Sequence, residues 1–567
     1  MVARFNTLPN LSICLALMAC SPAPAPTSAQ THADGNRVDG VVTYPASDFH
    51  EQAPGRRGGT LRVSAAADAG SFDIHALSHG NMQWMGRLLF DCLVAQDEQG
   101  NISPWLATSW DISADGKTYT FHLRQGVTFS DGERFDAAAL QANFEHMRDP
   151  ATKSPLAAAY IAPYIGGKVI DEYTFEAHLR EPYTPFLDVL AQSWLGMVSP
   201  RQIREAPKRI AQHPVGSGPF VLQSYTRDQR AVFVKRKGYD WAPAVTRHVG
   251  EAYLDRIELS YVPEAMIRFT ALESGQSDFA LDAPPQNAAA IRANPDLVLR
   301  SRIRKGNPSR SMTFNVEQPP FDDVRVRRAV AKAIDRDGLA WISGFGEFIG
   351  KADYLAANTR FYQPNGAALA YDVAAANALL DQAGWTGHDA QGYRTRNGQR
   401  LKATLLTYDN PAFPASVSVA IQADLKKVGF DMPIEVLPVT RVTERRYAGK
   451  FQALAAGYWH TNTPDGLFVL YHSQSISTAK LIGQNSGNFR DAELDSLLSA
   501  ARRSHDPDEL RRLYGAAQKR LTETVPAVPS VESQVLAAYR REVKGLIFDA
   551  SHNVPYFPSV WLDRGRP

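Results

Sequence analysis

The sequence predicts an α/β protein built of two or three lobes, and three observations indicate it. The chain has 567 residues, whereas a single core stops growing near ~250 to 300 residues. Residues 102–147 combine alternating strands with an amphipathic helical stripe, and residues 401–429 have the pattern of a strand, a loop and a helix that ends at a glycine. In α/β lobes ligands bind beyond the carboxyl ends of the strands, so the loops that follow strands are candidate binding sites.

The first twenty residues are typical of a secretory signal. Their apolar run 11–19 is too short for a membrane-spanning helix, which takes about 20 residues. Leu17-Met18-Ala19-Cys20 resembles a lipobox, so we expect Cys20 to carry lipid and to anchor the exported protein in the periplasm or cell envelope. The alternative is an ordinary signal peptide that is cut near Cys20. The next residues are uncharged Pro, Ala, Ser and Thr, which predicts a disordered tether.

Composition excludes several classes of partner. Without residues 1–20 the chain keeps 60 basic and 59 acidic residues, a net charge of +1, so neither nucleic acid nor a phospholipid surface is expected to bind. Contact with the membrane is expected only through the lipid. Cys92 would be the one cysteine left, which excludes a disulfide framework and a Cys-x-x-Cys metal site. We expect a monomer without cofactor or metal.

Residues 58–90 read as the first strand, a loop and a helix. Within 58–63 a glycine pair comes first and alternating strand residues follow, and the apolar pattern of 82–90 indicates a helix. Ser71 and Phe72 lie in the loop between them. They are either a capped surface turn or ligand-binding residues.

Residues 102–147 read as strand, hairpin, strand, turn and helix. From 117 to 124 apolar and polar residues alternate, and Asp115-Gly116 tolerates the positive φ of a hairpin turn. Asp136 stands where a helix N-cap belongs, and an apolar stripe follows at spacings of four and three residues. The unit therefore predicts two antiparallel strands followed by an amphipathic helix.

The same stretch carries a family resemblance. Pro-Trp-Leu-Ala-x-Ser-Trp (104–110), Asp-Gly-Lys-x-Tyr-x-Phe (115–121) and Leu-Arg-x-Gly-Val-x-Phe-Ser-Asp-Gly (123–132) together resemble the family 5 extracellular solute-binding proteins of bacterial ABC importers. Members of that family take up di- and oligopeptides, nickel chelates and some sugars. The resemblance implies a type II periplasmic binding protein, with two lobes, a β-rich inserted subdomain and a ligand cleft between the lobes. It also implies an ABC permease and ATPase as partners.

Matches at 58–62, 215–222, 319–335, 526–529 and 541–545 extend the resemblance over nearly all of the mature chain. They divide the chain as follows: 1–20 signal peptide, 21–57 tether, 58–90 first lobe, 91–213 inserted subdomain, 214–310 first lobe again, 311–525 second lobe, and 526–567 return to the first lobe. Residues 311–315 are expected to form a strand that crosses between the lobes. Arg325, Arg327 and Arg328 are predicted to form a solvated face of a helix.

Two loops of the second lobe are candidate ligand-binding sites. One follows the strand that ends near Tyr408, and the other is the glycine-flanked turn 457–465, rich in aromatic and polar side chains. A tryptophan in this turn either stacks on a ligand or lies in the core, and its polar neighbours favour the ligand. The predicted ligand-binding residues of the two loops are Tyr408, Asn410, Tyr458, Trp459, His460, Asn462 and Asp465.

Departures from the family bear on the solute. Its dipeptide-binding branch holds the peptide amine with an acidic residue of the 457–465 segment, and the carboxylate with an arginine just before the Asn-Pro of the other loop. This chain has Thr461 or Asn462 and Thr407 at those places, and Asp465 is left as a candidate amine partner. Losing both charges disfavours free dipeptides, because an unpaired buried charge costs several kcal/mol. We therefore predict longer peptides first, and oligosaccharides or a metal chelate second.

Other classes of protein were weighed against a binding protein. No His-Glu-x-x-His, Walker loop or cysteine–histidine pair is visible, and Gly216-Ser217-Gly218 lacks the spacing of a nucleophile elbow. We therefore expect no enzyme, and expect both glycines to be structural. A secreted hydrolase built on scattered carboxylates is one alternative. A ligand-sensing lipoprotein that contacts a receptor is another.

Overall fold

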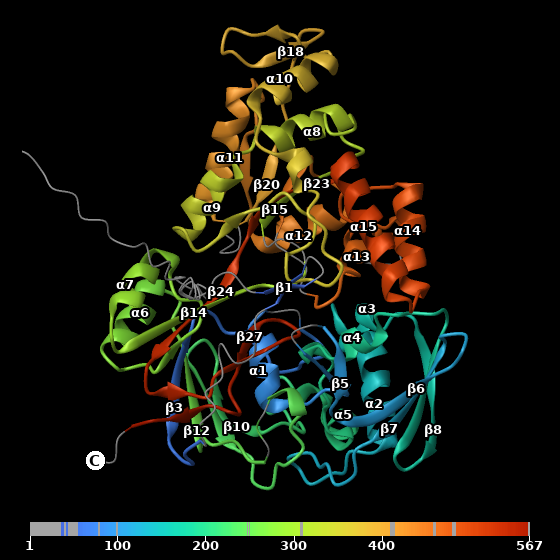
Figure 1. Ribbon diagram of the computed structural model, residues 1–567, viewed down its shortest axis with the longest axis vertical. Helices are drawn as coiled ribbons and strands as arrows, with labels where there is room; N and C mark the ends of the chain where they lie inside the picture. The colour runs from blue at the N-terminus through green and yellow to red at the C-terminus, as the bar shows by residue number, and fades with distance from the viewer. Residues whose placement is uncertain are drawn as a thin grey trace, which may run out of the picture. The chain divides into compact units, whose positions relative to one another are not determined.

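The computed structural model contains two large sheets, one of seven strands and one of six (Figure 1). The structure describes residues 36–38, 41–43, 55–77, 80–97, 100–246, 248, 250–306, 310–408, 414–456, 461–478 and 483–564. None of the helices in these ranges has the length and apolarity that a bilayer crossing requires. Cys20 and most of the predicted tether lie outside the described residues.

The first sheet is mixed. Its order is β10 (Phe220–Thr226), β11 (Arg230–Lys235), β12 (Arg256–Tyr261), β3 (Thr60–Ala65), β13 (Phe279–Ala280), β24 (Gln534–Arg540) and β14 (Leu297–Ile303). The central strand β3 runs parallel to β12 and β13, and the other pairs are antiparallel. Helices α1 (Met82–Leu89), α6 (Ala265–Glu273) and α7 (Ala288–Ala293) pack beside this sheet.

Gly216 and Gly218 precede this sheet and are structural, as predicted. A Cβ at Gly216 would lie 2.0 Å from the carbonyl oxygen of Leu89, and one at Gly218 would lie 2.4 Å from the Leu89 carbonyl carbon. Only glycine therefore permits the backbone to approach the end of α1 at both positions.

The inserted subdomain contains the predicted hairpin unit. An antiparallel sheet has the order β6 (Ala107–Ile112), β7 (Thr118–Leu123), β9 (Thr174–Leu179) and β8 (Tyr164–Asp171). Gly116 has a φ of +68° in the turn between β6 and β7. The Asp136 carboxylate accepts a hydrogen bond of 2.8 Å from the Ala139 amide at the start of α2 (Ala137–Arg148). Leu140, Phe144 and Met147 of α2 are fully buried, so the helical stripe is confirmed.

The second sheet has six strands, in the order β16 (Ile349–Gly350), β23 (Ala527–Glu532), β15 (Arg310–Phe314), β22 (Ala453–Ala456), β20 (Leu405–Thr407) and β21 (Ile434–Val436). β20 runs parallel to β21 and β22. The predicted strand-loop-helix unit is β20 followed by α11 (Ala415–Lys427), and Gly429 just beyond the helix has a φ of +72°. Near the sheet lie α8 (Val324–Ala333), α9 (Arg336–Gly344), α10 (Val373–Gln382) and α12 (Val439–Tyr447) (Figure 1).

The chain passes between the two sheets twice, at places that differ slightly from the predicted ones. Residues 311–315 were expected to cross, but β15 pairs with β22 and β23 inside the second sheet, so the first crossing lies between β14 and β15. The return was expected at 526. β23 still belongs to the second sheet, and the chain returns at Ser533, between β23 and β24. Both crossings therefore connect strands directly.

Several helices of the second half were not predicted, among them α9, α12, α13 (Gly466–Tyr471), α14 (Ala492–Arg503) and α15 (Pro507–Thr524). The end of α15 overturns the prediction of a solvated arginine face for Arg327. This side chain is buried, and its guanidinium donates to the carbonyl oxygens of Phe321, Thr524 and Val525. The last carbonyls of a helix lack partners within it, so a cation there is favourable.

The other elements are short. They are β1 (Asn36–Val38), β2 (Val41–Thr43), β4 (Val94–Gln96), β5 (Ile102–Pro104), α3 (Ala157–Tyr160), α4 (Phe186–Leu190), α5 (Pro200–Glu205), β17 (Gly387–His388), β18 (Arg394–Arg396), β19 (Gln399–Arg400), β25 (Val543–Lys544), β26 (Ile547–Asp549), β27 (Val554–Tyr556) and β28 (Trp561–Leu562). β1 and β2 pair as an antiparallel hairpin inside the stretch 21–57 that was expected to be disordered.

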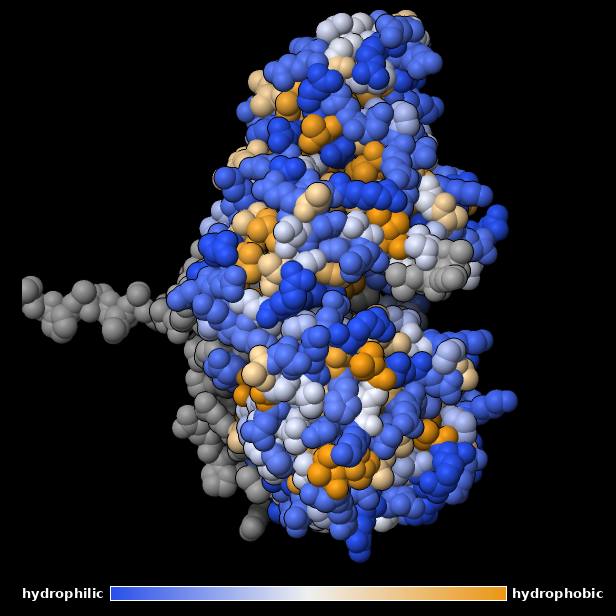
Figure 2. Space-filling model, turned by 90° about the vertical axis from the view of Figure 1, so that its right-hand side faces the viewer, coloured by the Kyte–Doolittle hydropathy of each residue, from blue (hydrophilic) through white to orange (hydrophobic). Residues whose placement is uncertain are grey.

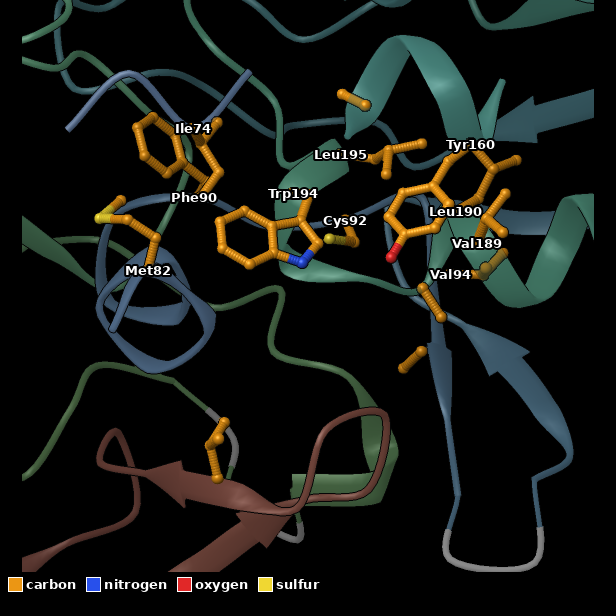
Figure 3. Packing of buried hydrophobic residues seen from close by; sticks show 14 of the residues in the cluster. Ile74, Met82, Phe90, Cys92, Val94, Tyr160, Val189, Leu190, Trp194 and Leu195 are labelled. Carbon is orange, nitrogen blue, oxygen red and sulfur yellow. The ribbon is translucent and has the colours of Figure 1, made fainter. Parts of the chain in front are cut away.

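Among the described residues, the two largest clusters of buried apolar side chains are a large core and a separate core for the second sheet. The large core joins the first sheet to the inserted subdomain, and Figure 3 shows Trp194, Cys92 and Leu190 within it. The second core contains Phe314 of β15 and Leu405 of β20. On the face drawn in Figure 2, hydrophobic residues form small patches within a mostly hydrophilic surface.

Candidate ligand-binding site

The ends of β20 and β22 define the candidate site. Because the two strands are parallel neighbours, their carboxyl ends lie at the same edge of the second sheet. Each end leads into one of the two predicted ligand-binding loops. Asn410, Tyr458, Trp459 and His460 lie outside the described residues, so their ligand roles stay predictions.

Tyr408 follows β20 directly. Its ring packs against a small cluster formed by Leu406, Val442, Phe451 and Leu454, and it is partly buried. Burial raises the pKa of the Tyr408 phenol, and the nearby charge of Arg446 lowers it. The side chain is thus held at the sheet edge beside a cation that the sequence did not single out.

Asn462 is buried and joins the second lobe to the inserted subdomain. Its Nδ2 donates to the Asp188 carbonyl oxygen at 2.7 Å, and its Oδ1 accepts from Gln192 Nε2 at 3.0 Å. Both ends of the amide are therefore engaged by residues of α4 and the turn that follows it.

Asp465 is also buried, and its carboxylate has three donors. Arg502 of α14 donates from Nε at 2.7 Å and from Nη2 at 2.8 Å, and the Tyr183 hydroxyl donates at 3.2 Å. Burial opposes the charge of Arg502, yet Asp465 raises the pKa of this guanidinium above its ordinary value. The Arg502 guanidinium also lies over the ring of Phe468. The amine-partner role of Asp465 stays a prediction, and this carboxylate is already bound in a bidentate pair.

A cavity of about 110 Å³ lies next to this network. Asp188, Arg360, Thr463 and Tyr514 are among its lining residues. Burial raises the pKa of Asp188 to about 6, although Arg360 opposes the shift. Small-molecule sites usually exceed about 300 Å³, so the cavity does not accommodate a peptide.

Ser71 and Phe72 belong to the first lobe. The Ser71 hydroxyl accepts a hydrogen bond of 3.1 Å from the Asp73 amide, as in a capped turn. Phe72 is buried, and its ring meets Tyr225 and Phe233 edge-on at centroid distances of 5.0 and 6.1 Å. The ligand roles of Ser71 and Phe72 stay predictions.

The positions where the resemblance expects charged clamps are neutral and buried. The Thr407 hydroxyl lies 3.3 Å from the Tyr408 carbonyl oxygen, and the Thr461 hydroxyl accepts from the Thr463 amide at 3.3 Å. Among the described residues, no group of three or more His, Cys, Asp or Glu side chains is arranged to hold a metal ion.

Sequence reasoning missed Arg446 and Arg502. Arg502 is 37 positions away from its partner Asp465, on a helix that was not predicted. Arg446 lies in the run Arg-Val-Thr-Glu-Arg-Arg (441–446), which looks like an ordinary solvated helix. The structure distinguishes them from neighbouring arginines, because Arg502 pairs with Asp465 whereas Arg446 donates to the neutral amide of Gln484.

Comparison with known proteins identifies a matching family model and similar proteins. The family model described as bacterial extracellular solute-binding proteins, family 5 Middle, matches residues 101–479. The glutathione-binding protein GsiB of Salmonella paratyphi A is 28% identical over 476 residues, which is 82% of this chain and 87% of that protein. GsiB of Escherichia coli O157:H7 is 28% identical over 473 residues, with the same coverage.

Two solved structures resemble this one over most of their length. The ABC transporter-associated periplasmic binding protein DppA from Helicobacter pylori, in complex with the peptide STSA, has a TM-score of 0.74 and 27% identity. It covers 90% of this chain and 99% of its own. NikA from Brucella suis, in complex with Fe(III)-EDTA, has a TM-score of 0.78 and 25% identity, and covers 89% of this chain and 100% of its own.

Proposed function

Because this chain belongs to family 5 of the bacterial extracellular solute-binding proteins, we propose that it captures a peptide between its two lobes and delivers it to the permease of an ABC importer. Its fold is that of the type II periplasmic binding proteins, as the sequence predicted. The observation that carries the proposal is the parallel pairing of β20 with β22, since each strand leads into a predicted ligand-binding loop at the same sheet edge.

Two observations favour a longer peptide as the solute: what the relatives bind, and the uncharged residues at the positions where the resemblance expects charged ones. The named relatives bind glutathione or a peptide, and both solutes carry amide bonds. Thr407, Thr461 and Asn462 offer no charge for the two ends of a free dipeptide. Backbone amides of a longer peptide match the aromatic and neutral polar residues of the two loops. A metal chelate is the second candidate, because the NikA structure holds Fe(III)-EDTA.

A thermal-shift screen tests the proposal. The purified protein is unfolded, refolded to remove bound solute, and screened with dipeptides, tetrapeptides, glutathione, oligosaccharides and Fe(III)-EDTA. We expect stabilisation by tetrapeptides or glutathione, and recovery of the solute unchanged by mass spectrometry, since the family consists of binding proteins and not enzymes. Stabilisation by oligosaccharides alone, or cleavage of the solute, would reject peptide capture.

Closure of the lobes is the second part of the proposal. A micromolar solute supplies about 8 kcal/mol, which is ample to bias a closure equilibrium of a few kcal/mol. Small-angle scattering should therefore show a smaller radius of gyration when the solute is bound. An unchanged radius at saturation would count against a clamp.

Lipid anchoring is the third part. The motif Leu17-Met18-Ala19-Cys20 supports a lipid on Cys20. Cys20→Ser should then move the protein from the membrane fraction to the soluble periplasmic fraction, as measured by fractionation and immunoblotting. If the variant stays membrane-bound to the same degree, the anchor is not at Cys20.

A further inference from the structure

The arginines of α12 differ in their partners. Arg441 lies 2.8 Å from the carboxylate of Glu444. Arg445 lies 2.6 Å from the carboxylate of Glu435. Arg446 has no carboxylate at salt-bridge distance among the described residues. Its Nη2 donates to the amide oxygen of Gln484 at 2.7 Å, and its buried Nε has no acceptor in the described part of the chain.

Arg446 lies on the face of α12 that meets the second sheet. Val442, one turn earlier, is buried with Leu406 of β20 and Leu454 of β22. Residues four apart share a helix face, so Arg446 is directed along the same side. Tyr408 packs on this cluster as well, and the Arg446 charge acts on its phenol. The Arg446 guanidinium, whose Nε has no acceptor among the described residues, therefore lies beside the end of β20, at the candidate site.

The environment of Arg446 is costly for its charge. Burial lowers the pKa of this guanidinium, and the phenol groups of Tyr447 and Tyr408 oppose the shift. A partly desolvated cation without an anion is unfavourable, and a carboxylate brought by a ligand relieves that cost through charge-assisted hydrogen bonds. Thr407, where the resemblance expects an arginine, is neutral. A positive charge at this sheet edge therefore comes from Arg446 of the neighbouring helix, which acts on Tyr408 just after β20.

We propose that Arg446 binds a carboxylate of the captured solute, so that the substrate class is peptides with a free C-terminal carboxylate or other small carboxylates. This inference rests on the proposed function and makes it more specific.

Matched peptides and matched variants test this role. Tetraalanine isolates the terminal carboxylate because its side chains are neutral, and its C-terminal amide lacks that charge. Both peptides, and glutathione beside its diethyl ester, are titrated calorimetrically into wild type, Arg446→Gln, Arg446→Lys and Arg445→Gln. Arg445→Gln is the control, since Arg445 is adjacent but already paired with Glu435.

We expect wild type to prefer the free acid over the amide by about 30-fold or more, because breaking a buried charge pair is strongly unfavourable. Arg446→Gln should lose that preference, Arg446→Lys should keep part of it, and Arg445→Gln should keep it fully. Equal affinity of wild type for acid and amide, or an unchanged preference in Arg446→Gln, would overturn the proposal. A merely structural role of Arg446 would weaken both peptides equally.

Thermal unfolding without solute separates this inference from the proposed function. We expect Arg446→Gln to unfold at the wild-type temperature or above, because the variant removes an uncompensated charge. A fall of more than about 5 °C would make Arg446 structural and overturn the proposal. If no peptide binds to wild type, peptide capture fails, and Fe(III)-EDTA, which carries carboxylates, is titrated into the same variants. Loss of its binding in Arg446→Gln alone would still support the role of Arg446, and unchanged binding would reject it.

Discussion

Asp465 and Arg446 are two charges of the second lobe that the protein treats in opposite ways. Asp465 is buried and receives Arg502 in a bidentate pair, with Tyr183 as a third donor. Arg446 is partly buried, yet its best partner in the described residues is the neutral amide of Gln484. Asp465 was predicted from the sequence as a ligand-binding residue, whereas Arg446 was not.

The difference teaches how to separate a structural charge from a functional one. A buried charge that is fully paired inside the protein holds elements together, here the 461–465 segment, α14 and the inserted subdomain. Under the proposal above, Arg446 keeps a partly desolvated charge because the solute supplies its counter-charge.

The largest expected effect comes from breaking the complete pair. Arg502→Met leaves the Asp465 carboxylate buried without a cation, and we expect a loss of about 3 to 5 kcal/mol in the free energy of unfolding. Denaturant titration measures it. The double variant Asp465→Asn/Arg502→Met should recover part of the loss, and a loss below about 1 kcal/mol in the single variant would mean that the pair does not hold the lobe together.

An intermediate effect should come from Asp188, a half-buried carboxylate that has no salt bridge among the described residues. Burial raises its pKa to about 6. The folded state therefore takes up a proton as the pH falls through 6, and the destabilisation present at neutral pH is relieved toward pH 4. Asp188→Asn should stabilise the protein by up to about 3 kcal/mol at pH 7.5 and by about 1 kcal/mol at pH 4.5. If Asp188→Asn stabilises the protein equally at both pH values, the raised pKa of Asp188 would be contradicted.

The smallest effect tests an arginine that is satisfied by carbonyl groups. Arg327→Met leaves the carbonyl oxygens of Phe321, Thr524 and Val525 without their donor, so we expect a loss of about 2 kcal/mol in the free energy of unfolding. Affinity for the solute should not change, in contrast to Arg446→Gln. If Arg327→Met unfolds like wild type but binds the solute more weakly, Arg327 would not be the structural arginine that we contrast with Arg446.

Much of the fold was readable from local patterns. The alternation around Tyr119 and Phe121, the N-cap at Asp136 and the glycine after α11 each depend on neighbouring residues, and each was confirmed. The predicted positions of the lobe crossings were wrong by a few residues. The sequences of β15 and β23 do not indicate which of the two sheets each strand joins. Strand partnership is decided by contacts distant in the chain.

The site was less readable for the same reason. The loops after β20 and β22 could be chosen because parallel strands bring their ends together. The partners of Asp465, Arg327 and Arg446 come from other elements, and no periodicity reports them. From sequence, an arginine in a charged helical run is predicted to be solvent-exposed. Only the structure shows which carboxylates lie near it.

A crystal structure of the protein with tetraalanine or glutathione bound tests the central distinction most directly. We predict that a carboxylate of the solute lies within about 3.2 Å of the Arg446 guanidinium, while the pair between Asp465 and Arg502 stays intact. A solute whose carboxylate displaces Asp465 from Arg502, with Arg446 left on Gln484, would contradict it.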